Sequence, residues 1–337
     1  MLGDEYRRFS EAAAATSPLY ERVALALSTS EEALSAIATT GNRHPAAVLA
    51  ALHDLALAGR APALAAAYAA RDADAAASAA IDTVLRTTDL TARRPLRADE
   101  TGRHAVLYPA VTEAARRVGA NAVGLIDVGR PAGLNLNVDR VGVTYDNGQA
   151  LGDAASPVQV SASVVGDRHV PAVAVPEVVA RVVVDRDPVD VTDPDAARWL
   201  RACLPPEHGE RLAAEIALAT PPLRLAGDPV EVLPAALARV PADALPVVTT
   251  TWALSALPLE GRLRFLHRLD EAATDRAVAW VSVEGVGVAP AVPTFGDRPA
   301  SGHSIIGLAV FGHSVLRAEA LGRCWSRGRM LLWLAGP

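Results

Sequence analysis

From Asn121 to the C-terminus, short runs rich in β-branched residues alternate with segments whose apolar residues recur at helical spacing. This alternation is typical of a mostly parallel sheet whose strands are joined by crossover helices. Strands are expected at residues 122–128, 180–185, 223–227, 245–251 and 277–285. Helices between them are expected to start near Pro131, Pro194, Val230 and Leu259. The pattern therefore predicts an α/β fold for this part of the chain.

The residues before Asn121 have a different texture and favour helices. Pro18 and Pro45 each suit the first position of a helix, and Thr29 with Glu32 forms a capping-box pattern. A further helix is expected to close on Gly119. We therefore expect an N-terminal helical domain at residues 1–118, acting as a lid on the substrate side, and an α/β domain at 119–337.

Two stretches depart from the alternation of strands and helices. Asp146-Asn147-Gly148 is a hairpin turn signal, and it predicts a β-rich insertion at about residues 141–175. Near the C-terminus, the segments at 304–312 and 314–322 suit an antiparallel hairpin that closes the sheet.

Composition limits the class of protein. The net charge of −6 argues against a nucleic-acid partner, because phosphate binding needs a clustered basic face. No apolar run reaches the roughly 20 residues that cross a bilayer, and the N-terminus lacks a signal-peptide pattern, so we expect a cytoplasmic protein without a membrane partner. The two cysteines lie far apart and the histidines follow no ligand spacing, so no metal site is expected. The oligomeric state stays open.

The turn after the first expected strand reads Asp127-Val128-Gly129-Arg130-Pro131-Ala132-Gly133. A dinucleotide-binding site requires glycine at the position of Asp127. The pyrophosphate binds at the start of the helix, and a carboxylate there would repel it. This disfavours a nicotinamide or flavin oxidoreductase. S-adenosylmethionine (SAM) has no phosphate, and its ammonium, sulfonium and ribose groups suit an acid followed by two glycines. A turn without any ligand remains the third alternative.

Further acids follow the next expected strands. Asp185 stands where an acid can accept from ribose hydroxyls, and Gly227-Asp228 where a carboxylate can take the adenine amine. Asp228 also precedes a helical segment, so a helix N-cap explains it equally well. The predicted SAM-binding residues are Asp127, Gly129, Gly133, Asn135, Asp185, Gly227, Asp228 and Thr249.

The acceptor pocket of such a fold is expected over the fourth and fifth strands. We predict that Thr250, Glu284 and Arg103 are catalytic. Glu284 acts either as a base or by holding a substrate amine, and Arg103 holds a substrate carboxylate. Tyr20, Glu100 and Trp252 are predicted to contact the substrate, and the Trp252 ring could also face the sulfonium. Each has a structural alternative: β-propensity for threonine, the core for tryptophan, and ion pairs for the charged residues.

Several stretches together resemble one family of uncharacterised, mainly actinobacterial proteins, known only as a domain of unknown function. They are "SPLYERVA", "DETGRHAVLYPAV", "IDVGRPAGLNLNVDR", "DRDPVDVTDPDAARWLRACLPPEHGERL" and "AWVSVEG". The resemblance runs from about Tyr6 to the C-terminus. It implies a Rossmann-like sheet of the class I SAM-dependent methyltransferase type, here with an N-terminal helical extension and a β-hairpin insertion. This chain departs from the family pattern, with Arg130-Pro131 in place of small residues and Thr249-Thr250 in place of His-Ser.

The expected function is a SAM-dependent transferase acting on a small molecule, in secondary metabolism. One alternative is a cyclase that uses the aminobutyl chain of SAM itself and releases methylthioadenosine. Another is a non-catalytic binding protein with the SAM fold, which acts as a partner or regulator. The sequence leaves these open.

Overall fold

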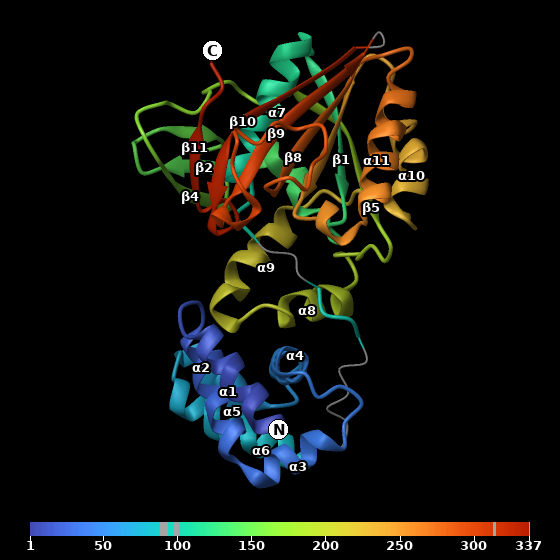
Figure 1. The fold of residues 1–337 in the computed structure, drawn as a ribbon. Coiled ribbons are helices and arrows are strands. Elements are labelled where there is room, and N and C mark those ends of the chain that lie inside the picture. The colour runs from blue at the N-terminus through green and yellow to red at the C-terminus, as the bar shows by residue number, and fades with distance from the viewer. Residues whose placement is uncertain (88–93, 98–100, 313–314, 337) are drawn as a thin grey trace. The chain divides into compact units, whose positions relative to one another are not determined.

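The computed structural model describes residues 1–87, 94–97, 101–312 and 315–336, and the chain divides into two compact units. The first, the helical unit, comprises residues 1–99 and 190–216. The second, the sheet unit, comprises residues 100–189 and 217–337. Figure 1 shows the helices and strands of the two units.

The helical unit begins with six helices: α1 (Leu2–Ala13), α2 (Pro18–Thr29), α3 (Glu31–Ala38), α4 (Pro45–Leu57), α5 (Pro62–Ala70) and α6 (Ala73–Arg86). Pro18 and Pro45 begin their helices as expected. The capping box at Thr29 is wrong by one residue: Thr29 ends α2, and the Ser30 side chain accepts from Ala33 N–H at the start of α3. One extended residue thus separates the two helices.

Buried apolar side chains from these helices form one core. It includes Val23 and Leu27 of α2, Leu49 and Leu52 of α4, and Leu64 of α5. No single helix among the described residues is long and apolar enough to cross a membrane; α4 and α5 pass that test only as a pair bent by 98°.

The helical unit is completed by a segment from much later in the chain: α8 (Pro194–Ala202), the short 3-10 helix η2 (Pro206–His208) and most of α9 (Gly209–Leu218). Trp199 of α8 packs against alanines of α4, and its Nε1 donates to the Pro95 carbonyl at 3.0 Å. Conversely, α7 (His104–Val118) lies within the predicted helical domain 1–118 but belongs to the sheet unit. The compact units therefore divide the chain differently from the expected domains 1–118 and 119–337.

The sheet unit is built on eleven strands: β1 (Ala122–Val128), β2 (Gly142–Tyr145), β3 (Ala150–Gly152), β4 (Gln159–Val164), β5 (Glu177–Asp185), β6 (Leu223–Ala226), β7 (Leu245–Thr251), β8 (Val278–Gly285), β9 (Ser304–Gly312), β10 (Val315–Trp325) and β11 (Met330–Trp333). Their order is β3-β2-β4-β11-β10-β9-β8-β7-β1-β5-β6. Strands β6, β5, β1, β7 and β8 are mutually parallel, and β9 and β10 run antiparallel to their neighbours. The fold is a mixed α/β fold with a mostly parallel sheet.

Helices cover both faces of the parallel part of the sheet. Helix α7 packs on one face, and α10 (Pro229–Leu237) and α11 (Leu259–Ala272) pack on the other (Figure 1). On the second face, Trp280 of β8 meets Phe265 of α11 edge to face, with ring centroids 5.6 Å apart. The strands read as apolar runs because both of their sides are buried.

The predicted strands, the β2–β3 hairpin and the antiparallel β9–β10 hairpin are confirmed. The helix expected from Pro131 is wrong. After β1 the chain forms the 3-10 helix η1 (Leu134–Arg140), which is kinked at Asn137. Asn135 and Asn137 direct their amides to other parts of the chain, and such side chains compete with regular helical structure. The remaining crossover contains β2, β3 and β4.

Candidate functional site at the carboxyl ends of the parallel strands

The order of the parallel strands reverses between β1 and β7. From β1 the chain proceeds to β5 and β6 on one side, and then returns to β7 and β8 on the other. In open α/β sheets, ligands bind beyond the carboxyl ends of the strands at such a switch point. Asp127, Asp185, Thr251 and Glu284 all lie at or near these ends. This edge of the sheet is therefore the candidate site.

The turn after β1 needs both of its glycines for packing. Gly129 and Gly133 have φ angles of 75° and 63°, in the left-handed region. A Cβ on Gly133 would lie 2.2 Å from Val183 Cγ2, and one on Gly129 would lie 2.7 Å from Ala253 Cβ. The glycines therefore let the turn lie against β5 and against the segment after β7, which supports the structural alternative for them.

Asp127 is fully buried within a network of its own chain. Thr249 Oγ1 donates to Oδ1 at 2.7 Å, and Asn135 Nδ2 donates to Oδ2 at 3.0 Å. Three of the predicted cofactor-binding residues thus come together, as mutual partners. The Asp127 carboxylate therefore has a structural role that requires no ligand, since a buried carboxylate must be hydrogen-bonded.

Two buried arginines converge on Thr251. Arg103 Nη1 donates to Thr251 Oγ1 at 3.4 Å, and the Arg130 guanidinium donates to the Thr251 carbonyl. Asn135 Nδ2 also reaches Thr251 Oγ1, at 3.3 Å. Arg103 is only 1% exposed and Arg130 6%. Burying so much charge costs free energy, and such clusters are enriched at functional sites.

Trp252 follows Thr251 in a conformation that non-glycine residues rarely adopt, with φ of 53°. Its Nε1 donates to Ser304 Oγ at 2.8 Å. The guanidiniums of Arg103 and Arg327 lie 5.5 and 5.9 Å from the ring centroid. The ring therefore already contacts cations of this chain. Sequence reasoning missed Arg327. It lies in the Ser326-Arg327-Gly328 turn, where all three φ angles are positive.

Thr250 and Glu284 lie on the other face of the sheet from Thr249 and Thr251, because side chains alternate along a strand. Trp280 Nε1 donates to Thr250 Oγ1 at 3.0 Å. Glu284 Oε1 accepts from the N–H groups of Ala253 and Leu254, and so fastens the turn after β7. Both predicted catalytic residues therefore have structural partners.

The second oxygen of Glu284, Oε2, is buried without a hydrogen-bond donor among the described residues. Burial raises the pKa of this carboxyl, while backbone N–H groups and the charge of Arg130 oppose the rise. The adjoining cavity, lined by Gly285, Val292 and Ile305 among others, measures about 10 Å³. That is about the space of one water molecule, so it does not admit a substrate.

The acids after β5 and β6 differ in their surroundings. Asp228 caps α10 by accepting from Val230 N–H, and it pairs with Arg186 at 3.2 Å, which matches the N-cap alternative. Asp185 is half-buried, and its Oδ1 accepts from Asp187 N–H at 2.9 Å. Gly227, with φ of 148°, donates its N–H to the Asp185 carbonyl. Of these two acids, Asp185 has fewer hydrogen bonds and ion pairs to its carboxylate within the described chain.

Two predicted substrate-contacting residues remain, Tyr20 and Glu100. Tyr20 belongs to the core of the helical unit, where its hydroxyl donates to the Leu204 carbonyl at 3.4 Å. Glu100 lies outside the described residues. Within the described part of the chain, no three His, Cys, Asp or Glu side chains are grouped to hold a metal ion.

The fold and this edge together define a mixed α/β protein with a buried charge cluster at the switch point of its sheet. Residues 3–333 match DUF2332, a family of uncharacterized proteins conserved in bacteria, and the chain belongs to that family. No curated protein matches the sequence.

Proposed function

We propose that this protein is a SAM-dependent transferase that acts on a small molecule at the carboxyl edge of the sheet. The strand order carries the proposal: β6-β5-β1-β7-β8 is the 3-2-1-4-5 order of Rossmann-like sheets, with its switch point between β1 and β7. In this class I methyltransferase-like reading, Asp185 accepts from the ribose hydroxyls, and the turn at Gly129–Gly133 lies under the amino-acid end of SAM.

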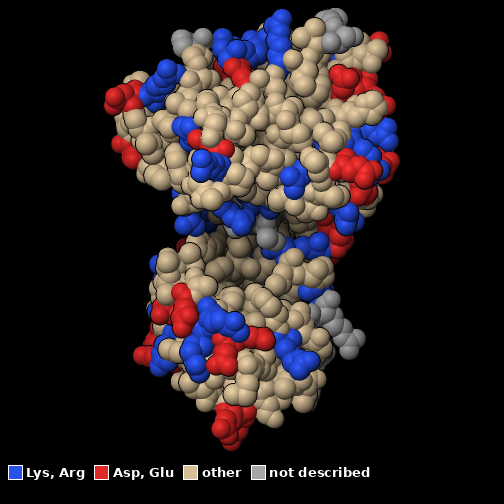
Figure 2. All heavy atoms as spheres, viewed as in Figure 1, with Lys and Arg blue, Asp and Glu red and all other residues tan. Residues whose placement is uncertain are grey.

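The charges at this edge favour an acidic acceptor. Arg103 and Arg327 flank Trp252, and the exposed Arg186 follows β5. Figure 2 shows basic side chains gathered along the lower edge of the sheet unit. A carboxylate acceptor is already deprotonated at neutral pH and requires no general base, so alkyl transfer to it depends mainly on placement. This suits a site whose candidate base, Glu284, is held by Ala253 and Leu254.

The alternative of a non-catalytic protein with the SAM fold, a partner or regulator, is favoured by a specific observation. Asp127 Oδ1 accepts a hydrogen bond from Thr249 and Oδ2 accepts one from Asn135, and the Trp252 ring contacts two arginines.

A cyclase acting on SAM alone uses the same cofactor site. Its product, methylthioadenosine, distinguishes it from a methyltransferase, which releases S-adenosylhomocysteine.

Titration calorimetry with SAM and S-adenosylhomocysteine tests the proposal. We expect binding to the wild type and about tenfold weaker binding to Asp185→Ala, because one ribose partner is lost. Asp167→Ala, an exposed residue of the sheet unit, is the matched control and should bind as the wild type does. Absence of binding at millimolar ligand, or equal binding to all three proteins, would remove SAM from this edge.

A further inference from the structure

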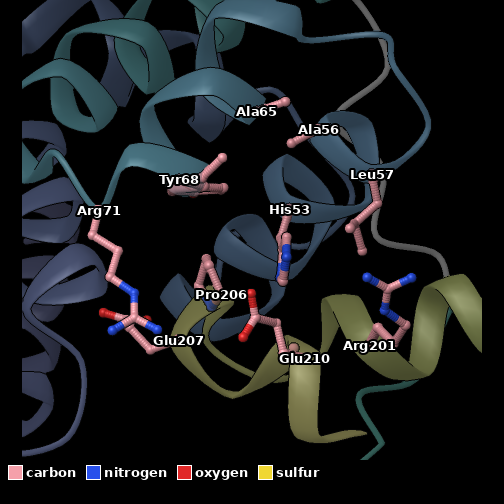
Figure 3. A pocket seen from close by; sticks show the side chains of 12 residues that line it. His53, Ala56, Leu57, Ala65, Tyr68, Arg71, Arg201, Pro206, Glu207 and Glu210 are labelled. Atoms are coloured by element: carbon pink, nitrogen blue, oxygen red, sulfur yellow. The ribbon is translucent and has the colours of Figure 1, made fainter. Parts of the chain in front are cut away.

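A cavity of about 210 Å³ is lined only by residues of the helical unit, and the proposed function uses none of them. Its walls come from α4, the end of α5, α8 and the segment leading into α9 (Figure 3). Ala56, Leu57 and Ala65 give it an apolar side. The volume is below the roughly 300–1,000 Å³ of pockets for drug-sized ligands, so its occupant is smaller.

Two polar groups that line this cavity are buried without a partner. The Tyr68 hydroxyl and Arg201 Nε have no hydrogen-bond partner among the described residues, although Tyr68 is only 7% exposed. Nor does the Arg201 guanidinium form an ion pair within the described chain. Buried polar groups in native proteins are almost always satisfied, by the protein, by water or by a ligand. Two unsatisfied donors in one cavity indicate an occupant that accepts hydrogen bonds.

His53 stands between these two groups in the view of Figure 3. Its ring meets Tyr68 edge to face at 5.6 Å, and its Nδ1 donates to the Leu204 carbonyl at 3.0 Å. Burial lowers the pKa of His53 to about 4, with the charge of Arg201 contributing, so the imidazole is neutral at pH 7. The proton on Nδ1 leaves Nε2 as an acceptor.

The acids that line the cavity do not neutralise Arg201. Glu207 accepts from Ser17 Oγ and from Leu19 N–H at the start of α2, so its carboxylate is committed to that helix N-terminus. Glu210 is exposed. A second arginine, Arg71, also lines the cavity; it is exposed and lies next to Glu207 in Figure 3. Arg201 is therefore the cation of the cavity that lies beside the neutral histidine and the apolar wall.

We propose that this cavity binds a small organic carboxylate with a short apolar chain. The carboxylate accepts from Arg201, and the chain lies against Ala56, Leu57 and Ala65. A charge-assisted hydrogen bond from a guanidinium to a carboxylate accounts for the otherwise unpaired Arg201. The Tyr68 hydroxyl serves a second oxygen, which is either the other carboxylate oxygen or a further polar group of the ligand.

The test uses the full chain and a panel of probes: butyrate, isovalerate, hexanoate, valine and leucine, each paired with its amide. Calorimetry should detect a carboxylate that binds and whose amide does not. Arg201→Gln should weaken that binding about tenfold or more, since a hydrogen bond to a charged group is lost. Arg60→Gln, an exposed arginine outside the cavity, should not. The proposal fails if no panel member binds at millimolar concentration, or if Arg201→Gln binds as tightly as the wild type.

Tyr68→Phe separates a ligand contact from a structural role. Because the hydroxyl has no hydrogen-bond partner in the part of the chain that the structure describes, its removal should leave the Tm of the ligand-free protein unchanged or higher, yet weaken binding. Tyr6→Phe removes a hydroxyl that donates to the Arg43 carbonyl at 3.4 Å, and it should lower the Tm without affecting binding. A drop in Tm for Tyr68→Phe with unchanged binding would contradict the proposal. Failure of SAM to bind the sheet unit would leave this test unaffected.

Discussion

Asp297 shows how far single charges in this protein are fixed by their neighbours. Arg323 donates from Nε to Oδ2 of Asp297 at 2.6 Å and from Nη2 to Oδ1 at 2.9 Å. His303 Nε2 lies 2.8 Å from Oδ2. His303 Nδ1 in turn faces the Ser301 carbonyl at 3.3 Å. Both ring nitrogens of His303 therefore face oxygen atoms, and Asp297 joins Arg323 and His303 in one cluster.

This cluster makes stability depend on pH in a defined window. The bonds from Arg323, and then that from His303, lower the pKa of Asp297 from 3.8 to about 2. Its contribution to stability is full above pH 3.8 and is lost as the pH falls through about 2. Asp297→Asn should flatten the fall of unfolding free energy with pH across this window, measured by urea titration. Arg323→Gln should flatten it in the same way; an unchanged slope in both variants would contradict the assignment.

At the residue scale, the sequence predicted where acids stand more reliably than what they do. Asp127 and Asp185 were expected at the ends of strands, and they are there, because apolar β-rich runs with clear ends can be read locally. That Thr249 would bond to Asp127 depends on β7 lying beside β1, which only the tertiary fold decides. That Asn135 would bond to it depends on the path of the chain through η1. The contact of Arg327 with Trp252 depends in the same way on chain segments far apart in the sequence.

At the scale of elements, the strands were predictable and the first crossover was not. The β7 run carries valine and threonine on both of its sides, and the β8 run carries valine on both of its sides. Such runs are typical of strands whose two faces are both buried. After β1, glycine and proline indicated a helix start, yet the asparagines of η1 make tertiary hydrogen bonds that break the helical register. Local propensity therefore lost to tertiary contacts.

Gly133 tests the packing of this crossover. Gly133→Ala should destabilise the protein by about 2–4 kcal/mol, since alanine is strained at φ of 63° and its Cβ would overlap Val183. Gly148→Ala is the control: its φ of 86° is also positive, but its Cβ would meet nothing within 4 Å. It should cost only the backbone strain, about 1–2 kcal/mol. Equal losses in urea unfolding would show that Gly133 is not held by packing.

For the whole molecule, the sequence indicated two kinds of structure but not how the chain is shared between them. The pattern of α8 shows that one of its faces is buried, but not that Trp199 packs on the alanines of α4. Contacts between segments so far apart in sequence leave no local signal. The segment at 190–216 therefore joins the helical unit, although it is inserted between β5 and β6.

Separate cores in the two units predict two unfolding transitions. Leu52 is fully buried in the core of the helical unit, and Val248 is fully buried in that of the sheet unit. Leu52→Ala should cost about 2–5 kcal/mol in its own core, and Val248→Ala somewhat less because its side chain loses fewer carbon atoms. In scanning calorimetry, each variant should lower the temperature of one transition and leave the other in place. One transition, shifted by both variants alike, would mean that the two cores unfold as a single cooperative structure.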